Sequence, residues 1–388
     1  MIIKHFTDND LYKFSIMLAI QKLYPKAAVR YKFINRGGRK FPEGFAEALR
    51  SEIADMAELK LSKEEKQFIE KRCYFFDPVF IDFLEGYRYN PDEVRIKQEA
   101  GNLEILVEGY WYRTVLWEVP LMSIISELFF KMTGAFPVEV ESKALMKAKA
   151  LNVLNADYSD FGTRRRFSFD VQDKVVETLK IHSGGNFKGT SNMYLAMKHD
   201  LTPIGTMPHE WFMYHGAMYG YRAANAKALD AWIEVFQGSL GISLTDTYTT
   251  DSFFASFGLK HAKLFDGVRC DSGDPINFTD KIVKFYRDKR IDPASKTVVF
   301  SDSLNLDKVK QIKEHVAGRV HDTYGIGTFL TNDAGVSPLN MVIKLTHVKS
   351  SIEENDYLAA VKLSDIEGKN TGNEREIEIC KLTLGLRK

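Results

Sequence analysis

An alternation of short apolar segments with amphipathic segments over residues 136–348 limits the folds open to this chain. Each apolar segment ends in small or acidic residues and is followed by a helical pattern, at roughly 25–35 residues per unit. This order is typical of βαβ units, whose strands pair in parallel. Several consecutive units predict an irregular α/β barrel, with a doubly wound open sheet as the alternative. The expected strands lie within residues 202–207, 241–248, 262–274, 297–303, 320–328 and 340–348.

The first 135 residues follow a different pattern. Residues 27–36 and 101–120 are strand-like, and residues 62–72 form a charged helical pattern. Strands and helices mixed in this way indicate an α+β domain with antiparallel strands. The sequence therefore predicts an N-terminal α+β domain over 1–135, the barrel over 136–348, and a charged tail over 349–388 that packs back on the N-terminal domain.

The composition excludes several classes of protein. The formal net charge is +1, so no overall field attracts nucleic acid or an anionic membrane. The most apolar stretch, residues 120–130, is too short to span a bilayer and contains Glu127. The three cysteines are far apart and form neither a disulfide framework nor a zinc site. We expect a cytoplasmic protein without a signal peptide that binds neither nucleic acid nor membranes.

Polar residues and glycines recur where the expected strands end. Ligands bind at this edge of a parallel sheet, whether the sheet is closed or open. We therefore expect these side chains to converge on one pocket. They are His209, Asp246, Arg269 with Asp271, Ser301 with Asp302, and Gly325 with Gly327.

The segment HEWFMYH, residues 209–215, invites comparison with the zinc motif HExxH. That motif places two histidines four residues apart on one helical face. His209 and His215 are six apart, about 240° around a helix, so they cannot bind one ion together. The residues leave two interpretations open. His209 is either a buried structural histidine or a pocket residue, and Glu210 suits the first turn of a helix.

The segment FDGVRCDSGDP, residues 265–275, is the richest in candidate ligand contacts. Arg269 and Asp271 alternate along a strand and therefore share one face. Ser272 and Gly273 belong to the turn that follows, and turns are rich in such residues for conformational reasons. A turn does not require the arginine, which can clamp a carboxylate or phosphate, while the aspartate can accept hydrogen bonds from ribose hydroxyls.

Three other segments are weak signals individually. YGIGTFLTND, residues 324–333, has glycines that let the backbone approach a phosphate, although no helix clearly follows. DFGTRRRFSFD, residues 160–170, has three arginines that suit either a solvated surface or a polyanionic ligand. NFKGTSN, residues 186–192, adds a lysine and hydroxyls. Together the segments predict a pocket for a phosphorylated sugar or nucleotide.

Several segments, in this order and spacing, resemble the nicotinate phosphoribosyltransferase family. They are TDNDLYKFSIMLAI, EVPLMSIISELFF, GTMPHEWFM, LTDTY, AKLFDGVRCDSGDP, VVFSDSLNL and YGIGTFLTND. The resemblance implies an enzyme that joins nicotinate to the ribose of phosphoribosyl diphosphate, releasing diphosphate and forming nicotinate mononucleotide for NAD biosynthesis. It also implies ATP hydrolysis through a phosphohistidine, Mg²⁺, and a homodimer with shared active sites.

The resemblance also implies roles for particular residues. His209 would be phosphorylated, with Asp271 and Asp246 as catalytic side chains, Asp246 supporting the site or Mg²⁺. Tyr12, from the other subunit in such enzymes, would stack on the pyridine ring opposite Phe161. Ser191 or Thr190 would face the nicotinate carboxylate, and Arg164 or its neighbour Arg165 would bind the phosphate or the ring. The remaining substrate contacts would be Arg269 with Ser272, Gly273, Ser301 and Asp302. Around the 5′-phosphate they would be Gly325, Gly327 and Thr328.

Three alternatives stay open at this point. Nicotinamide phosphoribosyltransferase is the nearest within the enzyme class. A metal-dependent barrel hydrolase would need clustered histidine and carboxylate ligands, which His209 and Asp246 alone do not supply, and no residue is assigned as a certain metal ligand. A catalytically silent nucleotide-binding regulator is the third.

Overall fold

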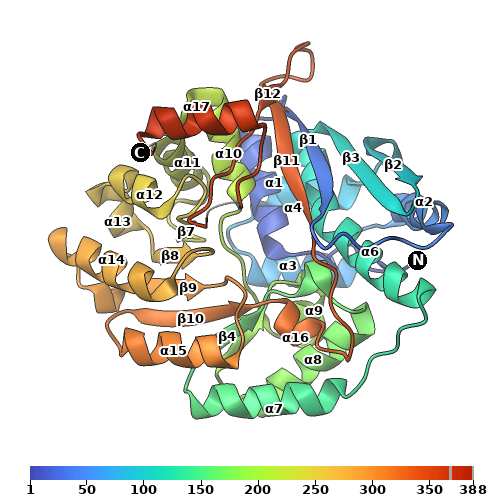
Figure 1. Cartoon of the computed structure of the whole chain (residues 1–388), viewed down its shortest axis with the longest axis horizontal. Helices are drawn as coiled ribbons and strands as arrows, with labels where there is room; N and C mark the ends of the chain where they lie inside the picture. Colours follow the sequence, from blue (N-terminus) through green and yellow to red (C-terminus); the bar gives the residue numbers. More distant parts are fainter. Residues whose placement is uncertain (367–368, 387–388) are drawn as a thin grey trace. The chain divides into compact units, whose positions relative to one another are not determined.

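The computed structural model describes residues 1–366 and 369–386, and these residues group into two compact units (Figure 1). The first unit contains Met1–Leu18, Arg30–Gly205 and Ile326–Lys344. The second contains Ala19–Val29, Thr206–Gly325 and the described residues from Leu345 onward. Contacts therefore divide the chain differently from the three ranges 1–135, 136–348 and 349–388, which stay a prediction about sequence-defined domains.

The parallel strands confirm the α/β class, as an open half-barrel of order β6-β5-β4-β10-β9-β8-β7. In the second unit, β7 (Ile242–Leu244), β8 (Gly267–Cys270), β9 (Thr297–Phe300) and β10 (His321–Ile326) pair in parallel. In the first unit, β4 (Asp157–Asp160), β5 (Phe187–Thr190) and β6 (Thr202–Pro203) do the same.

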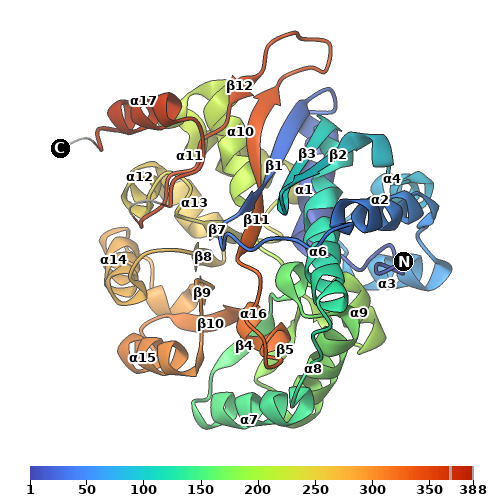
Figure 2. The same cartoon turned by 45° about the vertical axis from the view of Figure 1, so that its right-hand side comes forward.

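Helices alternate with the strands of the second unit, as the sequence pattern predicted. They are α10 (His209–Tyr219), α11 (Tyr221–Phe236), α12 (Thr250–Ser256), α13 (Leu259–Leu264), α14 (Pro275–Asp288) and α15 (Leu306–Val316). In both views α12, α14 and α15 lie on the same side of β7 to β10 (Figures 1 and 2). The start of α14 is set locally, since Asp274 accepts a hydrogen bond from the Ile276 amide and Pro275 occupies the first turn.

The second sheet is antiparallel and has the order β12-β11-β1-β3-β2. Its strands are β1 (Ala28–Asn35), β2 (Val94–Glu99), β3 (Asn102–Tyr110), β11 (Met341–Lys349) and β12 (Leu358–Ala359). The expectation that residues 340–348 continue the parallel series was wrong. β11 alternates between buried and partly exposed residues over most of its length, which is typical of a strand with one face on a core.

The expected strand over residues 101–120 was wrong in its second half. β3 ends at Tyr110, and the helical pieces α5 (Trp111–Thr114) and α6 (Glu118–Met132) follow. Residues from Val119 to Phe130 are buried all round the helix, so their apolar run shows no clear period. None of the helices in the described part of the chain is long and apolar enough to cross a membrane.

The remaining helices belong mainly to the first unit. Helix α3 begins with a capping box, because Ser62 and Glu65 each accept a hydrogen bond from the other's backbone amide. These helices are α1 (Leu11–Leu23), α2 (Phe45–Asp55), α3 (Lys63–Arg72), α4 (Pro78–Gly86), α7 (Val140–Val153), α8 (Phe169–His182), α9 (Met193–Lys198) and α16 (Thr328–Thr331), with α17 (Glu374–Leu384) in the second unit.

Candidate active site

Three predicted residues of the second unit lie together where β7 and β8 end. His209 is the first residue of α10, Asp246 follows β7, and Asp271 follows β8. The Nε2 atom of His209 lies 2.8 Å from Oδ1 of Asp246 and 3.9 Å from Oδ2 of Asp271. A carboxylate only accepts hydrogen bonds, so the His209 Nε2–H donates to Asp246 and the ring's lone pair lies on Nδ1.

The charges of this cluster favour a neutral imidazole between ionised carboxylates. Burial, followed by the charge of Lys362, lowers the pKa of His209 to about 4, against the opposing effect of Asp246. Burial opposes ionisation of Asp271, but Arg269 outweighs it and lowers the pKa to about 2. The pKa of Asp246 also lies well below its usual range, because His209 and Lys362 outweigh its burial. One ring nitrogen of His209 is therefore unprotonated at neutral pH.

Arg269 is oriented by three side chains. Its Nε donates to Ser301 Oγ over 2.8 Å, and its Nη1 donates to Thr206 Oγ1 over 2.9 Å. Its Nη2 lies 2.6 Å from Asp271 Oδ1, which also accepts a 2.6 Å hydrogen bond from Ser301. The predicted pairing of Arg269 with Asp271 is therefore present in the structure, and Thr206 is a contact that sequence reasoning missed.

The neighbouring predicted residues differ in how they join this cluster. Ser272 donates a 2.7 Å hydrogen bond to Oδ2 of Asp246. Gly273 has a φ of +82°, a conformation that side chains disfavour, so it permits the turn after β8. The Asp302 carboxylate accepts a hydrogen bond from the adjacent Ser303 hydroxyl, outside the contacts that connect His209, Asp246 and Asp271. Sequence position therefore brought Asp302 to the strand end without bringing it into the cluster.

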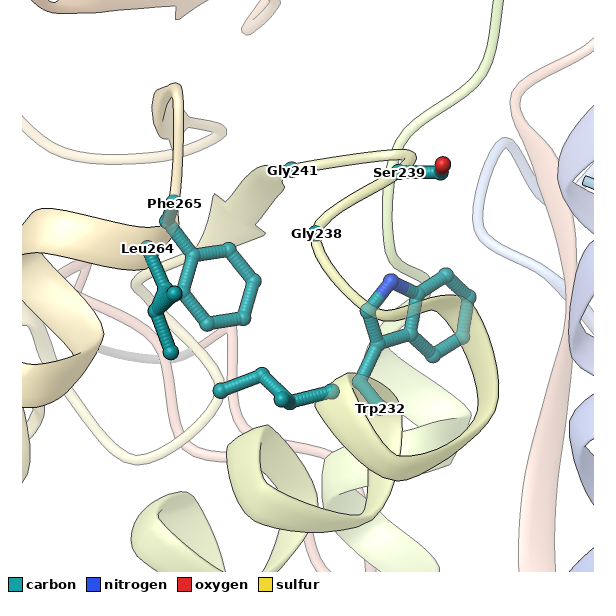
Figure 3. A pocket seen from close by; sticks show the side chains of 7 residues that line it. Trp232, Gly238, Ser239, Gly241, Leu264 and Phe265 are labelled. Carbon is teal, nitrogen blue, oxygen red and sulfur yellow. The ribbon is translucent and has the colours of Figure 1, made fainter.

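An apolar hollow of about 170 Å³ lies at the amino-terminal ends of β7 and β8. Figure 3 shows its lining, which comes from the end of α11, the turn before β7 and the segment before β8. None of the lining residues is titratable, so the hollow offers no acid, base or cation to a phosphorylated substrate. They are Trp232, Ile233, Gly238, Ser239, Gly241, Leu264 and Phe265.

In the first unit, Glu118 connects two residues that the resemblance assigned to the substrate. Its carboxylate accepts a 3.1 Å hydrogen bond from the Tyr12 hydroxyl and lies 3.3 Å from Arg164 Nη1. Lys13, which is fully buried, lies 2.6 Å from the same carboxylate. Burial opposes ionisation of Glu118, but Lys13 and Arg164 lower its pKa to about 2. Sequence reasoning missed Glu118 and Lys13, although Lys13 adjoins Tyr12.

The hydroxyls of Thr190 and Ser191 are held by two buried carboxylates. Thr190 donates to Asp160 and Ser191 donates to Asp10, both over 2.8 Å. Burial raises the pKa of Asp160 to about 6 and also raises the pKa of Asp10. Both aspartates lie beyond the predicted set. The DFG order at Asp160 was the available signal, since the carboxylate also accepts a hydrogen bond from the Gly162 amide.

The structure separates the three consecutive arginines. Arg166 is fully buried and makes two 2.7 Å hydrogen bonds to Asp8, a structural pairing. Arg164 and Arg165 are partly exposed and are the two that a ligand could contact. Burial and then the charges of Arg164 and Arg36 lower the pKa of Arg165 to about 10. An anion bound near this segment would reduce the repulsion between the guanidinium groups of Arg164, Arg165 and Arg36.

The glycine segment ends β10 and differs from expectation in one respect. The single-turn helix α16 begins at Thr328, directly after Gly327, so a helix does follow. A side chain at Gly327 would bring its Cβ within 3.2 Å of the Phe161 carbonyl oxygen. Gly325 belongs to the second unit and Gly327 to the first. The predicted contact of both glycines with a phosphate stays a proposal.

The ligand atoms of His209, Asp246 and Asp271 all lie within 4.8 Å of one another. The expectation that only two metal ligands were available here was therefore incomplete, since Asp271 supplies a third. Magnesium prefers carboxylate oxygens to imidazole, so the aspartates fit that ion better than the complete triad does.

An α/β fold with a partly buried, neutral histidine, ionised carboxylates and an oriented arginine at its strand ends indicates an enzyme that acts on phosphorylated substrates. Comparisons with known proteins make the class specific. The model of the nicotinate phosphoribosyltransferase (NAPRTase) family matches residues 156–383, and the model of its N-terminal domain matches residues 7–126.

Whole proteins agree with these matches. The chain is 50% identical over 382 residues to a nicotinate phosphoribosyltransferase of Desulforapulum autotrophicum, covering 98% of both chains. It is 48% identical to one of Chromohalobacter salexigens, covering 98% of this chain and 97% of the relative. The crystal structure of nicotinate phosphoribosyltransferase from Porphyromonas gingivalis matches with a TM-score of 0.97 at 46% identity, covering 99% of this chain and 100% of that one. This chain belongs to the nicotinate phosphoribosyltransferase family.

Proposed function

We propose that this protein transfers the phosphoribosyl group of phosphoribosyl diphosphate to nicotinate, in a reaction coupled to ATP hydrolysis through phosphorylation of His209. Membership of the family supports the reaction, and the family implies ATP and phosphoribosyl diphosphate as substrates. The 2.8 Å hydrogen bond between His209 and Asp246 carries the proposed coupling. It orients a neutral imidazole with its lone pair on Nδ1, the arrangement that a nucleophilic histidine requires.

In the phosphorylation step, Nδ1 of His209 attacks the γ-phosphorus of ATP. The Nδ1–P bond forms, the bond from phosphorus to the β,γ-bridging oxygen breaks, and ADP leaves with that electron pair. Asp246 holds the Nε2 proton and stabilises the positive charge that develops on the ring. The phosphoryl group changes the local charge by about −2, and we propose that this tightens substrate binding.

In the transfer step, the pyridine nitrogen of nicotinate attacks C1′ of the ribose while the C1′–O bond to diphosphate breaks. Nicotinate mononucleotide and diphosphate are the products. The protein holds the two reactants in line and neutralises the leaving group, and it needs no nucleophile of its own toward the sugar. Tyr12 and Phe161 would hold the ring, while Arg269 and Asp271 would contact the ribose.

We assign the remaining contacts on the same basis. Ser191, with Thr190 beside it, would face the nicotinate carboxylate, and Arg164 or Arg165 would bind a phosphate or the ring. Ser272, Gly273, Ser301 and Asp302 would complete the ribose side, and Gly325, Gly327 and Thr328 would surround the 5′-phosphate. Mg²⁺ would be held by Asp271 and Asp246 and would neutralise charge on the diphosphate.

Replacing His209 tests the coupling. His209→Asn should abolish covalent labelling by γ-labelled ATP and the stimulation of transfer by ATP, while ATP-independent transfer persists. His215→Asn is the matched control, because His215 is buried against Trp211 and Tyr24 within the same unit. Labelling that persists in His209→Asn would contradict the assignment.

One observation favours nicotinamide as a second candidate substrate. The Asp10 carboxylate lies 2.8 Å from Ser191 Oγ, and a carboxylate near the ring can accept a hydrogen bond from an amide. The two substrates should be compared in the wild type and in Ser191→Asp. We expect the wild type to prefer nicotinate and the variant to shift toward nicotinamide. An unchanged preference would remove Ser191 from the residues that set specificity.

We further propose a cytoplasmic homodimer whose active sites are shared between subunits. The three buried thiols Cys73, Cys270 and Cys380 suit a reducing compartment. The dimer and its shared sites rest on the family resemblance.

A further inference from the structure

The segment Ala360–Asp365 supplies a cation to the proposed phosphorylation site. The Nζ atom of Lys362 lies 3.2 Å from Oδ2 of Asp246, the carboxylate whose other oxygen binds His209. The Lys362 side chain is only 11% exposed. Sequence reasoning assigned no role to this lysine, which is separated from Asp246 by 116 residues of chain.

Backbone contacts hold Lys362 in this position. Its amide donates to the Thr371 carbonyl and its carbonyl accepts from the Thr371 amide, both over 2.8 Å. The Leu363 amide donates to the carbonyl of Thr247, the residue directly after Asp246. The segment is therefore attached to the same strand end that positions the carboxylate.

Asp365 completes the attachment on the other side. Its carboxylate accepts hydrogen bonds from the amide and hydroxyl of Thr250, over 2.8 Å and 2.5 Å. Its amide donates to Ser272 Oγ, which itself donates to Asp246. The contacts from Lys362 to Asp365 thus form a connected network around Asp246, the carboxylate that binds His209.

The charge balance explains why a lysine is needed. Asp246 and Asp271 lie beside His209, and phosphorylation would add about two negative charges to this cluster. Lys362 and Arg269 are the cations that contact these two carboxylates in the described part of the chain. Arg269 is directed at Asp271, Ser301 and Thr206, whereas Lys362 contacts Asp246, the hydrogen-bond partner of His209.

We propose that Lys362 is a positioning residue for the phosphorylated form of His209. Lys362 pairs with Asp246 before phosphorylation and with the phosphoryl oxygens afterwards. The contacts of the segment Ala360–Asp365 with the site therefore depend on whether His209 is phosphorylated. The inference rests on the proposed function, since it requires phosphorylation of His209. Lys362 protects the N–P bond against hydrolysis, in which a water oxygen bonds to phosphorus, the N–P bond breaks and its electron pair returns to Nδ1, and inorganic phosphate is released with the protons of the water.

The experiment compares the wild type with Lys362→Met, Lys362→Gln and Lys362→Arg. Each protein is labelled with γ-labelled ATP, freed of nucleotide, and followed for loss of label. We expect the phosphoenzyme to lose its label at least tenfold faster in Lys362→Met and Lys362→Gln, and at close to the wild-type rate in Lys362→Arg. Lys381→Met is the control, since Lys381 pairs with Glu378 on the surface of α17.

The outcomes separate this inference from the function on which it rests. Absence of label in the wild type would contradict the phosphohistidine itself. Wild-type labelling with an unchanged lifetime in Lys362→Gln would overturn the role of the lysine and leave the proposed function intact. If Lys362→Met unfolds, Lys362→Gln and Lys362→Arg still test the role of the charge. A purely structural role would give the same label lifetime with glutamine, a neutral hydrogen-bond donor, as with arginine, a cation.

Discussion

At the scale of single residues, the protonation state of His209 decides whether the proposed phosphoryl transfer can begin. The sequence placed this residue at a strand end and excluded a shared zinc ion with His215, but left a structural histidine open. The hydrogen bond to Asp246 fixes the orientation of the His209 ring, and the two residues are 37 positions apart in the chain. Such a distant pairing is visible only once the strands are arranged in space.

The lowered pKa of His209 predicts an unusual pH profile. Because the reactive form is neutral and its pKa is about 4, the initial rate of labelling at saturating ATP should stay level as the pH falls from neutral, and decline only as it approaches that value. A histidine of ordinary pKa would lose half of its nucleophilic form at about pH 6.5. A midpoint near that ordinary value would show that the site does not hold the imidazole neutral.

Glu118 illustrates a site residue that sequence reasoning could not identify. It lies in a segment that reads as apolar core, and its role depends on contacts with Tyr12 and Arg164. Glu118→Gln should raise the KM for nicotinate about tenfold, equivalent to about 1.4 kcal/mol, with little change in kcat. Glu47→Gln, which alters an exposed pair with Arg50, is the control. An unchanged KM would leave Glu118 without a positioning role.

At the scale of elements, long helices and apolar strands were predictable, whereas the short strands β4 and β5 were not. The pattern of α14 and α15 repeats over several turns, and each helix has an N-cap in the sequence. By contrast, β4 and β5 have four residues each, and β4 reads DYSD, so neither produces a hydrophobic period. The N-cap of α12 is Thr249, whose side chain accepts a hydrogen bond from the Ser252 amide, while Asp251 pairs with Lys281.

The segment after β4 depends on a buried ion pair. Arg166 and Asp8 are both fully enclosed, so removing the arginine leaves an uncompensated charge. Arg166→Met should lower the free energy of unfolding by about 3–5 kcal/mol in a denaturant titration. Arg50→Met, at an exposed pair with Glu47, should change it by about 1 kcal/mol at most. Equal small effects would show that Arg166 does not anchor the segment.

The same segment is packed closely against α16. A Cβ atom on Gly162 would lie 2.3 Å from Thr331 Oγ1, and that hydroxyl already donates to the Gly162 carbonyl. Gly162→Ala should therefore shift Arg164 and lower kcat/KM about tenfold or more. Gly86→Ala, where a Cβ would meet nothing within 4 Å, is the control. Wild-type kinetics in Gly162→Ala would contradict the requirement for this close approach.

At the scale of the whole molecule, the alternation of strands and helices predicted the α/β class, and the motifs predicted the family. The pattern did not predict the two contact units, because β1, β10 and β11 each continue from one unit into the other. It also placed residues 340–348 in the wrong sheet. The hydrophobic period of a strand shows whether one face or both faces are buried, but it does not show which strands pair with it.

The proposed shared active sites predict complementation between inactive variants. Tyr12→Ala should lose nicotinate binding and His209→Asn should lose ATP coupling. If the two residues of one site come from different subunits, mixed dimers contain one intact site. Subunit exchange should then restore ATP-dependent product formation to about a quarter of the wild-type level, the statistical share for random pairing. Activity no greater than that of the separate variants would place Tyr12 in the site of its own subunit.

The central claim is that this protein forms nicotinate mononucleotide and uses ATP to drive that reaction. Mass spectrometry of the products formed from nicotinate and phosphoribosyl diphosphate tests it most directly, with and without ATP. We predict nicotinate mononucleotide in both cases, in greater amount with ATP, and loss of the ATP effect in His209→Asn. Absence of nicotinate mononucleotide under both conditions would contradict the account.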